Sequence, residues 1–224
     1  MAYFPMYVSI EGKRALVVGG GEVALRKASV LLDFGANPVV VAAELLPQLR
    51  ELSGVRCVQR EFEEKDLADC VLVVAATNDP GKNHAVAELA RAQGIPVNAV
   101  DQPGDCSFIF PSYIKRNNLV AAFSSGGKSP AMAKHLRREF AGILTEKLGE
   151  QNEYLGSIRE RVRAEVEPER RGLVYEQILA ELLASGATAL DEERFREIER
   201  PDGERFREIG KPDGERQKEA EGRI

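Results

Sequence analysis

The sequence contains no tryptophan, two histidines and three cysteines among its 224 residues. Cys57, Cys70 and Cys106 form no CxxC pair, so a cysteine-based zinc site is excluded. Because His84 and His135 are the only histidines, a histidine-rich metal cage is excluded as well, and we expect no bound metal cofactor. An odd number of thiols suits a reducing compartment, so we expect a cytoplasmic protein.

Long apolar runs are also missing. None approaches the roughly 18 residues that cross a bilayer, and residues 1–10 do not pair a basic region with an apolar one as a secretory signal does. We therefore expect no contact with membranes. The chain holds 31 Lys and Arg against 36 Asp and Glu, for a net charge of −5. This balance argues against a nucleic-acid partner that is held by a large overall positive charge.

Charge is concentrated at the end of the chain. Residues 191–224 hold 12 acidic and 9 basic side chains, so three of the five net negative charges lie there. The sequence of residues 193–198 recurs at 204–209, and that of 201–205 recurs at 212–216. The Pro-Asp-Gly in the second repeat is typical of turns and interrupts helices. We predict a solvated tail over 191–224, mostly disordered or frayed helix and flexible, with partner binding as the alternative.

The first hundred residues alternate between strand and helix patterns. The helical segments end at glycines that are typical of helix C-termini, and Asp79-Pro80 is typical of a helix N-terminus. The apolar runs between them are continuous, as in parallel strands that are buried on both faces. They cover residues 15–18, 38–42, 55–59, 71–76 and 97–100. The pattern predicts a Rossmann-type doubly wound α/β domain over residues 1–112.

Beyond Asp101 the pattern changes. We predict strands at 107–110 and 119–123, joined through Pro111 and the polar residues 115–118. Ser129-Pro130 then predicts the start of a helix. Its apolar stripe consists of Met132, Leu136, Phe140, Ile143, Leu144 and Leu148.

Such a stripe must be buried, and a second copy of the chain is a natural partner. We therefore assign residues 113–150 to a dimerisation segment and expect a homodimer. Helical patterns at 154–166 and 173–184 predict a small helical domain over 151–190.

One motif carries recognisable chemistry. Residues 19–24, Gly-Gly-Gly-Glu-Val-Ala, match G-x-G-x-x-A between a strand and a helix, which is the context of a dinucleotide-binding turn. Gly19 permits the tight turn, and Gly21 lets a pyrophosphate approach the backbone N–H groups of the helix start. The alternative is a glycine-rich turn that binds nothing.

Further cofactor contacts are expected at the carboxyl ends of the strands, where open α/β sheets bind ligands. Glu44 follows the second strand and lies 20 residues after Ala24, the place of an acid that binds the ribose 2′-OH and favours NAD over NADP. Alternatively, Glu44 belongs to the first turn of a helix before Pro47. The predicted cofactor-binding residues are Gly19, Gly21, Glu22, Val23, Ala43, Glu44, Thr77, Asn78 and Asn98.

Asp101 is the most informative carboxylate. It follows the fifth strand, where it would face the nicotinamide end of the cofactor, and we predict a catalytic role for it. A helix or turn cap near Pro103 is the alternative. Basic and small residues further on predict a site for a substrate with several carboxylates, unless they form an ordinary solvated face. The predicted substrate-binding residues are Ser125, Gly126, Lys128, Arg116 and Arg137.

Five motifs in order suggest a family. They are VVGGGEVALRK at 17–27, AATND at 75–79, VNAVD at 97–101, CSFIFPS at 106–112 and SSGGKSP at 124–130. Together they resemble the precorrin-2 dehydrogenase/sirohydrochlorin ferrochelatase family, the dehydrogenase part of siroheme synthase, over residues 1–185.

The resemblance implies a homodimeric enzyme that oxidises the tetrapyrrole precorrin-2 to sirohydrochlorin with NAD⁺. It also implies, in some members, insertion of Fe²⁺ to form siroheme. Asp101 would serve dehydrogenation and, where present, chelation. The alternatives are a dehydrogenase with a separate chelatase, or a non-catalytic NAD-sensing module, which leaves Asp101 and residues 124–130 unexplained.

Overall fold

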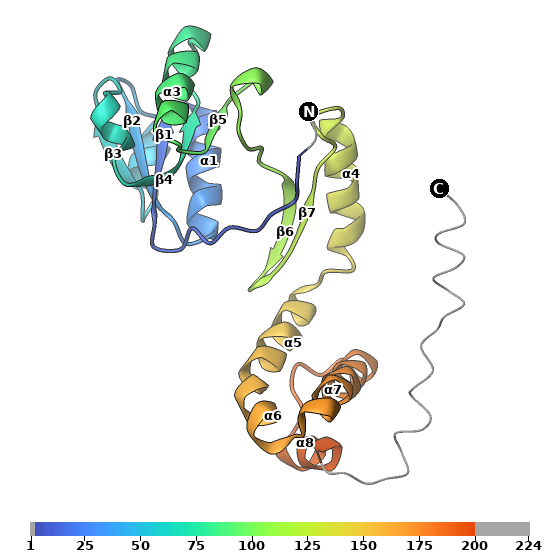
Figure 1. Ribbon diagram of the computed structural model, residues 1–224. Helices are drawn as coiled ribbons and strands as arrows, with labels where there is room; N and C mark the ends of the chain where they lie inside the picture. Colours follow the sequence, from blue (N-terminus) through green and yellow to red (C-terminus); the bar gives the residue numbers. More distant parts are fainter. Residues whose placement is uncertain (1–2, 200–224) are drawn as a thin grey trace. The chain divides into compact units, whose positions relative to one another are not determined.

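The computed structural model describes residues 3–199, which form two units (Figure 1). The first unit contains the chain up to Ser112 together with Phe123–Lys134. The second contains Tyr113–Ala122 and the chain from His135 onward. The predicted dimerisation segment, 113–150, is therefore divided between the two units.

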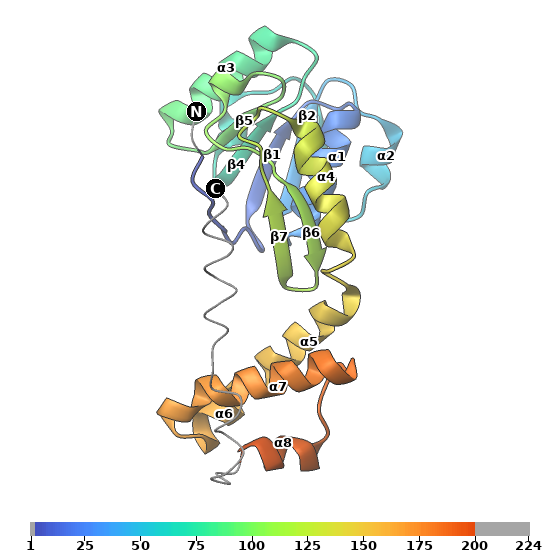
Figure 2. The same ribbon diagram turned by 90° about the vertical axis from the view of Figure 1, so that its right-hand side faces the viewer.

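The first unit is built on a five-stranded sheet whose strands all run parallel, in the order β3-β2-β1-β4-β5. Figure 2 shows β1 between β4 and β2. The strand order reverses between β1 and β4, which is where such sheets bind ligands. The prediction of a doubly wound parallel sheet is confirmed. The strands are β1 (Arg14–Val18), β2 (Asn37–Ala42), β3 (Arg56–Gln59), β4 (Cys70–Ala75) and β5 (Val97–Ala99).

Helices cover both faces of this sheet. Alternate residues of β1 point to opposite faces, so Val17 packs with α1 (Glu22–Asp33) and α2 (Pro47–Glu51), whereas Leu16 packs with α3 (Pro80–Ala92). All strands but the outermost are therefore buried on two sides, which is why their sequences are continuously apolar.

The predicted helix ends are confirmed. Gly35 follows α1 with a φ of +75°, in the left-handed region that favours glycine. At the start of α3, the Asp79 carboxylate accepts hydrogen bonds from the backbone N–H groups of Gly81 and Lys82 at 2.8 and 3.2 Å. Two 3₁₀ turns, η1 (Glu64–Leu67) and η2 (Pro103–Asp105), precede β4 and follow β5.

The prediction of a strand at 107–110 is wrong. Ser107 bonds to Val97 through both its backbone and its hydroxyl, but the segment then leaves the sheet without forming a ladder. The next strand begins after Pro111, as β6 (Ser112–Arg116), and pairs with β7 (Leu119–Phe123). The turn between them is formed by Asn117, whose φ is +52°, and Asn118, so Lys115 and Arg116 lie in a strand and not in the predicted connection.

The apolar stripe predicted for one helix is divided between two. α4 (Pro130–Ala141) begins as predicted, with the Ser129 hydroxyl accepting from the N–H of Met132 at 3.2 Å. It ends before Gly142, and the Thr145 hydroxyl caps a new helix, α5 (Glu146–Ser157). The apolar periodicity predicted one continuous helix, but the cap formed by Thr145 starts a second one.

The second unit has its own core of helices. Val162, Val174, Ile178 and Leu182 are fully buried there. The boundary predicted between residues 150 and 151 falls inside α5. After α5 come α6 (Arg159–Glu165), the 3₁₀ turn η3 (Pro168–Arg170), α7 (Arg171–Ser185) and α8 (Glu192–Glu199). Within residues 3–199, no helix combines the length and apolarity that a membrane span requires.

The first part of the predicted tail is an ordered helix. α8 carries the first copy of the repeat, and its Phe195 and Ile198 are 2% and 1% exposed in the core of the second unit. Arg161 lies over the Phe195 ring at 4.0 Å and forms an ion pair with Glu192. Ion pairs between Arg194 and Glu181 also hold α8 against α7, so the tail prediction is wrong for 191–199. The second copy, 204–209, lies outside the described residues.

Candidate functional site

The turn from β1 to α1 leaves no room for side chains at its first two glycines. Gly19 has a φ of +127°, and a Cβ on it would lie 2.3 Å from the carbonyl oxygen of Ala76. A Cβ on Gly20 would lie 1.9 Å from the carbonyl oxygen of Glu44. The turn is therefore pressed against the chain that leaves β4 and β2.

Gly21 differs from these two glycines, because the space beside it is open. Its φ of −92° suits any residue, and a Cβ on it would have no described atom within 4 Å. No side chain in the described chain caps α1 here, and the first backbone bond of the helix runs from Leu25 N–H to the Gly21 carbonyl. The N–H groups of residues 22–24 thus remain available. A bare glycine beside them lets a phosphate approach the helix start.

A pocket of about 850 Å³ opens at the carboxyl ends of β1, β2 and β4. This edge of the sheet is where the sequence predicts ligand contacts, and the strand order places the switch point there. The structure brings six predicted cofactor-binding residues together around it: Gly19, Gly21, Ala43, Glu44, Thr77 and Asn78. Their contacts with a cofactor stay a prediction.

The sequence analysis missed the apolar walls of this pocket. Leu46 borders it from the start of α2, Phe62 from the segment after β3, and Val86 and Leu89 from α3. Gly20 was also missed as a constrained position, although it stands in the middle of the glycine run. No local pattern marks the walls, because segments distant in sequence form them.

Three predicted cofactor residues lie outside the pocket lining. Glu22 and Val23 occupy the first turn of α1, and the negative charge of Glu22 suits a helix N-terminus. Asn98 is buried in β5, where its amide donates to the Phe108 carbonyl at 3.0 Å and thereby holds the chain that leaves the sheet. Their roles toward a cofactor stay predictions.

Asp101 follows β5 in a turn and has an unusual backbone conformation. Its φ is +60°, which is uncommon outside glycine, and the residue is exposed. The preceding N–H, of Val100, bonds to the Ala75 carbonyl at 2.9 Å and ties this turn to β4. An exposed carboxylate therefore stands at the carboxyl end of the sheet, as the prediction requires, though outside the pocket lining.

A lysine that the sequence analysis did not single out lies in the same unit. The Lys27 ammonium sits 3.6 Å above the ring centroid of Phe110. Burial, together with repulsion from Arg26, lowers the pKa of Lys27 to about 8. An amine with that pKa exists in both protonation states near neutral pH.

The segment before α4 uses most of its backbone donors locally. The N–H groups of Gly126 and Ser129 bond to the hydroxyls of Ser124 and Ser125, at 3.1 and 2.9 Å. These two N–H groups are therefore engaged within the segment. Lys128 is exposed.

The other two predicted substrate residues belong to the second unit. Arg116 donates to the Leu144 carbonyl at 3.1 Å and pairs with Glu146 at 3.2 Å, which gives it a local role in joining β6 to α5. Arg137 is exposed on α4.

Residues 6–112 match a family model described as putative NAD(P)-binding. The chain is 39% identical over 206 residues to the siroheme synthase of Pseudomonas aeruginosa (strain LESB58), a match that covers 88% of this chain and 44% of the relative. It is 43% identical over 167 residues to that of Pseudomonas entomophila (strain L48), covering 73% of this chain and 36% of the relative. The chain thus spans less than half the length of these curated relatives.

A solved structure titled "SirC, precorrin-2 dehydrogenase" aligns with a TM-score of 0.67 and 23% identity. The match covers 88% of this chain and 96% of that one. At this identity the likeness shows the fold, which the two chains share over nearly their whole lengths.

Proposed function

This chain belongs to the same family as part of siroheme synthase, and we propose that it catalyses the NAD⁺-dependent oxidation of precorrin-2 to sirohydrochlorin. One observation carries the proposal: 39% identity to a siroheme synthase over 206 residues of this chain. The pocket at the switch point of the sheet supports it, because a dinucleotide-dependent oxidation needs such a site.

The residues of the pocket fit NAD. The open space beside Gly21 and the N–H groups of residues 22–24 would hold the pyrophosphate. Glu44 lines the pocket and would accept a hydrogen bond from a ribose hydroxyl, while its charge would repel the 2′-phosphate of NADP. When bound, NAD⁺ supplies the acceptor for a hydride.

Removal of a hydride from a ring carbon must be accompanied by loss of a proton. Asp101 is the residue that we assign to this step, because its exposed carboxylate follows β5 at the carboxyl end of the sheet. It would accept the proton as a general base or orient the ring for its loss. The carboxylates of precorrin-2 would bind cations, for which exposed Lys128 is a candidate in the first unit, near Ser125 and Gly126 in sequence, and exposed Arg137 is a candidate in the second unit.

Three finer features belong to the same proposal. The name of the relatives supports a second activity, insertion of Fe²⁺ as a substrate to give siroheme. Exposed apolar residues on and after α4, at Met132, Phe140 and Ile143, support a homodimer, since such side chains favour burial against a second copy. The three free thiols support a reducing compartment such as the cytoplasm.

The test is to incubate the pure protein with precorrin-2 and NAD⁺ without oxygen and to follow the absorption spectrum. We expect an NAD⁺-dependent conversion to sirohydrochlorin with formation of NADH. Absence of this conversion would contradict the enzyme proposal and favour a binding module. Addition of Fe²⁺ afterwards tests metal insertion, and no further spectral change would restrict the protein to dehydrogenation.

A further inference from the structure

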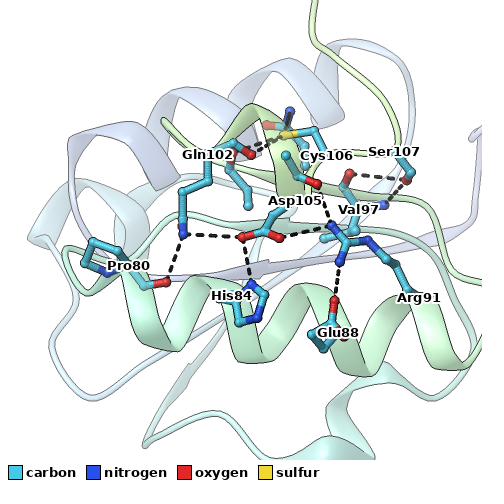
Figure 3. Close-up of polar contacts among 12 residues, drawn as sticks. Pro80, His84, Glu88, Arg91, Val97, Gln102, Asp105, Cys106 and Ser107 are labelled. Atoms are coloured by element: carbon cyan, nitrogen blue, oxygen red, sulfur yellow. Dashed lines mark hydrogen bonds and ion pairs between the residues drawn. The ribbon is translucent and has the colours of Figure 1, made fainter. Parts of the chain in front are cut away.

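The turn that follows Asp101 contains a carboxylate with three side-chain partners. Asp105, the last residue of η2, places its Oδ2 atom 3.0 Å from Nδ1 of His84 and 3.4 Å from Nε2 of Gln102 (Figure 3). Its Oδ1 atom accepts from Nη2 of Arg91 at 3.1 Å. The Asp105 side chain is 15% exposed, so these contacts replace most of its solvent.

These contacts fasten the turn to α3 along the length of that helix. Gln102 donates from Nε2 to the carbonyl oxygen of Pro80, the first residue of α3, at 3.1 Å. Arg91, near the end of α3, also donates to the carbonyl oxygen of Gly104 at 3.0 Å. We call His84, Arg91, Gln102 and Asp105 the α3 clamp.

The charges within the clamp are balanced. The hydrogen bond from His84, with that from Arg91, holds the pKa of Asp105 below its ordinary value, so its carboxylate is ionised at neutral pH. Ligand atoms of His84, Glu88 and Asp105 lie within 4.8 Å of one another, a spacing that suits a metal ion. Arg91, however, forms ion pairs with both carboxylates, Glu88 and Asp105, and places its own positive charge between them. The group is therefore better suited to fixing the turn than to holding a cation.

The α3 clamp holds the turn that follows Asp101, a residue with a left-handed backbone conformation. A left-handed φ at a residue other than glycine persists when surrounding contacts hold it in place. The flanking residue Gln102 is held through its side chain by Pro80 and through its backbone N–H by the Ala99 carbonyl at 3.3 Å. Moreover, α3 begins directly after Thr77–Asp79, which line the pocket. The clamp thus ties the turn of Asp101 to the wall of the cofactor pocket.

We propose that Asp105, through the α3 clamp, is a positioning residue that holds Asp101 in place for proton transfer. The inference rests on the proposed function, because it assumes that Asp101 acts in the oxidation of precorrin-2. Asp105 itself would touch neither the substrate nor the cofactor.

The test compares Asp105→Ala and Asp105→Asn with the wild type. For Asp105→Ala we expect kcat to fall by about tenfold or more, because small displacements of a catalytic group are costly. The KM values for NAD⁺ and precorrin-2 should stay within about twofold, since only the transition-state contact is disturbed. Asp105→Asn retains an acceptor for His84 or Arg91 and should recover part of the loss. Glu88→Gln removes the other carboxylate that contacts Arg91 and should leave kcat unchanged.

A second measurement does not depend on turnover. The backbone amide resonance of Asp101 should shift or broaden in Asp105→Ala and stay in place in Glu88→Gln. An unchanged kcat in Asp105→Ala, or an unmoved Asp101 resonance, would overturn the positioning role. If the wild type fails to oxidise precorrin-2, the proposed function fails, while the resonance still decides whether Asp105 positions Asp101. Asp105→Asn serves for this measurement if Asp105→Ala does not fold.

Discussion

Gly20 and Glu44 approach so closely that a single added carbon on Gly20 would lie 1.9 Å from the Glu44 carbonyl oxygen. The contact is reinforced by the carbonyl of Gly20, which accepts from the N–H of Leu46 at 2.9 Å. The phosphate-binding turn and the segment that carries the ribose-binding candidate are therefore locked together by their backbones. The glycine at position 20 serves the protein's own packing, whereas Gly21 borders open space.

Gly20→Ala should destabilise the fold by about 2 kcal/mol, because the new Cβ must displace backbone and not a flexible side chain. It should also weaken NAD⁺ binding, since the displaced segment carries Glu44. Urea denaturation and calorimetric titration measure the two effects. Gly156→Ala, on α5 with no described atom within 4 Å of the new carbon, is the control and should not lower stability.

Gly21→Ala, unlike Gly20→Ala, should leave the stability of the fold unchanged and affect only NAD⁺ binding. The protein accommodates a Cβ there without contact, so its unfolding free energy should stay within about 0.5 kcal/mol of the wild type. The Cβ would occupy the space assigned to the pyrophosphate, and we expect the Kd for NAD⁺ to rise by about tenfold or more. Retention of wild-type affinity in calorimetric titration would contradict this assignment.

Glu44→Ala should reduce the preference for NAD⁺ over NADP⁺. Loss of a charged hydrogen bond to the ribose costs roughly 1.5–3 kcal/mol, which corresponds to at least about tenfold in the Kd for NAD⁺. Binding of NADP⁺ should weaken less or improve, because the repulsive charge is gone. Glu64→Ala removes another acidic side chain that lines the pocket and should leave the ratio of the two affinities unchanged.

Asp101→Asn should abolish precorrin-2 oxidation while retaining NAD⁺ binding. Loss of a general base costs about 10²- to 10⁴-fold in rate. Turnover is measured from NADH formation and NAD⁺ affinity by titration. Asp69→Asn provides a matched control, because Asp69 is also an exposed aspartate with a φ of +60°. Full turnover in Asp101→Asn would rule out its catalytic assignment.

Acid sensitivity of the first unit should depend on Asp66. This carboxylate is 6% exposed and accepts two hydrogen bonds from Arg60, at 2.6 and 2.7 Å, which hold its pKa below the ordinary value. Because the folded-state pKa lies below the unfolded one of about 3.9, the stabilisation is present above that pH and is lost as the pH falls through the folded-state pKa.

Asp66→Asn should therefore cost about 2 kcal/mol at pH 7 and progressively less as the medium is acidified below about pH 4. Urea denaturation across this pH range measures the difference. Glu160→Gln, which removes an exposed ion pair with Arg163, should change stability by less than about 0.5 kcal/mol at any pH. A constant deficit for Asp66→Asn down to pH 2 would contradict the assigned pKa shift.

The sequence by itself determined the elements whose signals are local. Apolar runs, helix caps such as Asp79 and the glycines after β1 depend on the backbone preferences and side chains of neighbouring residues. They were sufficient to predict the parallel sheet, ligand contacts at the carboxyl ends of its strands and six residues of the pocket lining. The family resemblance rests on the same local motifs.

Only the tertiary structure decided features that depend on distant partners. The high charge of residues 191–199 predicted a solvated segment. Phe195 and Ile198 nevertheless pack the helix α8 against α6 and α7, which provide the complementary surface. Asp105 acquires two of its three side-chain partners, His84 and Arg91, from α3, 21 and 14 residues earlier in the chain. Such contacts arise when packing brings remote segments together, and their free energy depends on burial and geometry that no local pattern encodes.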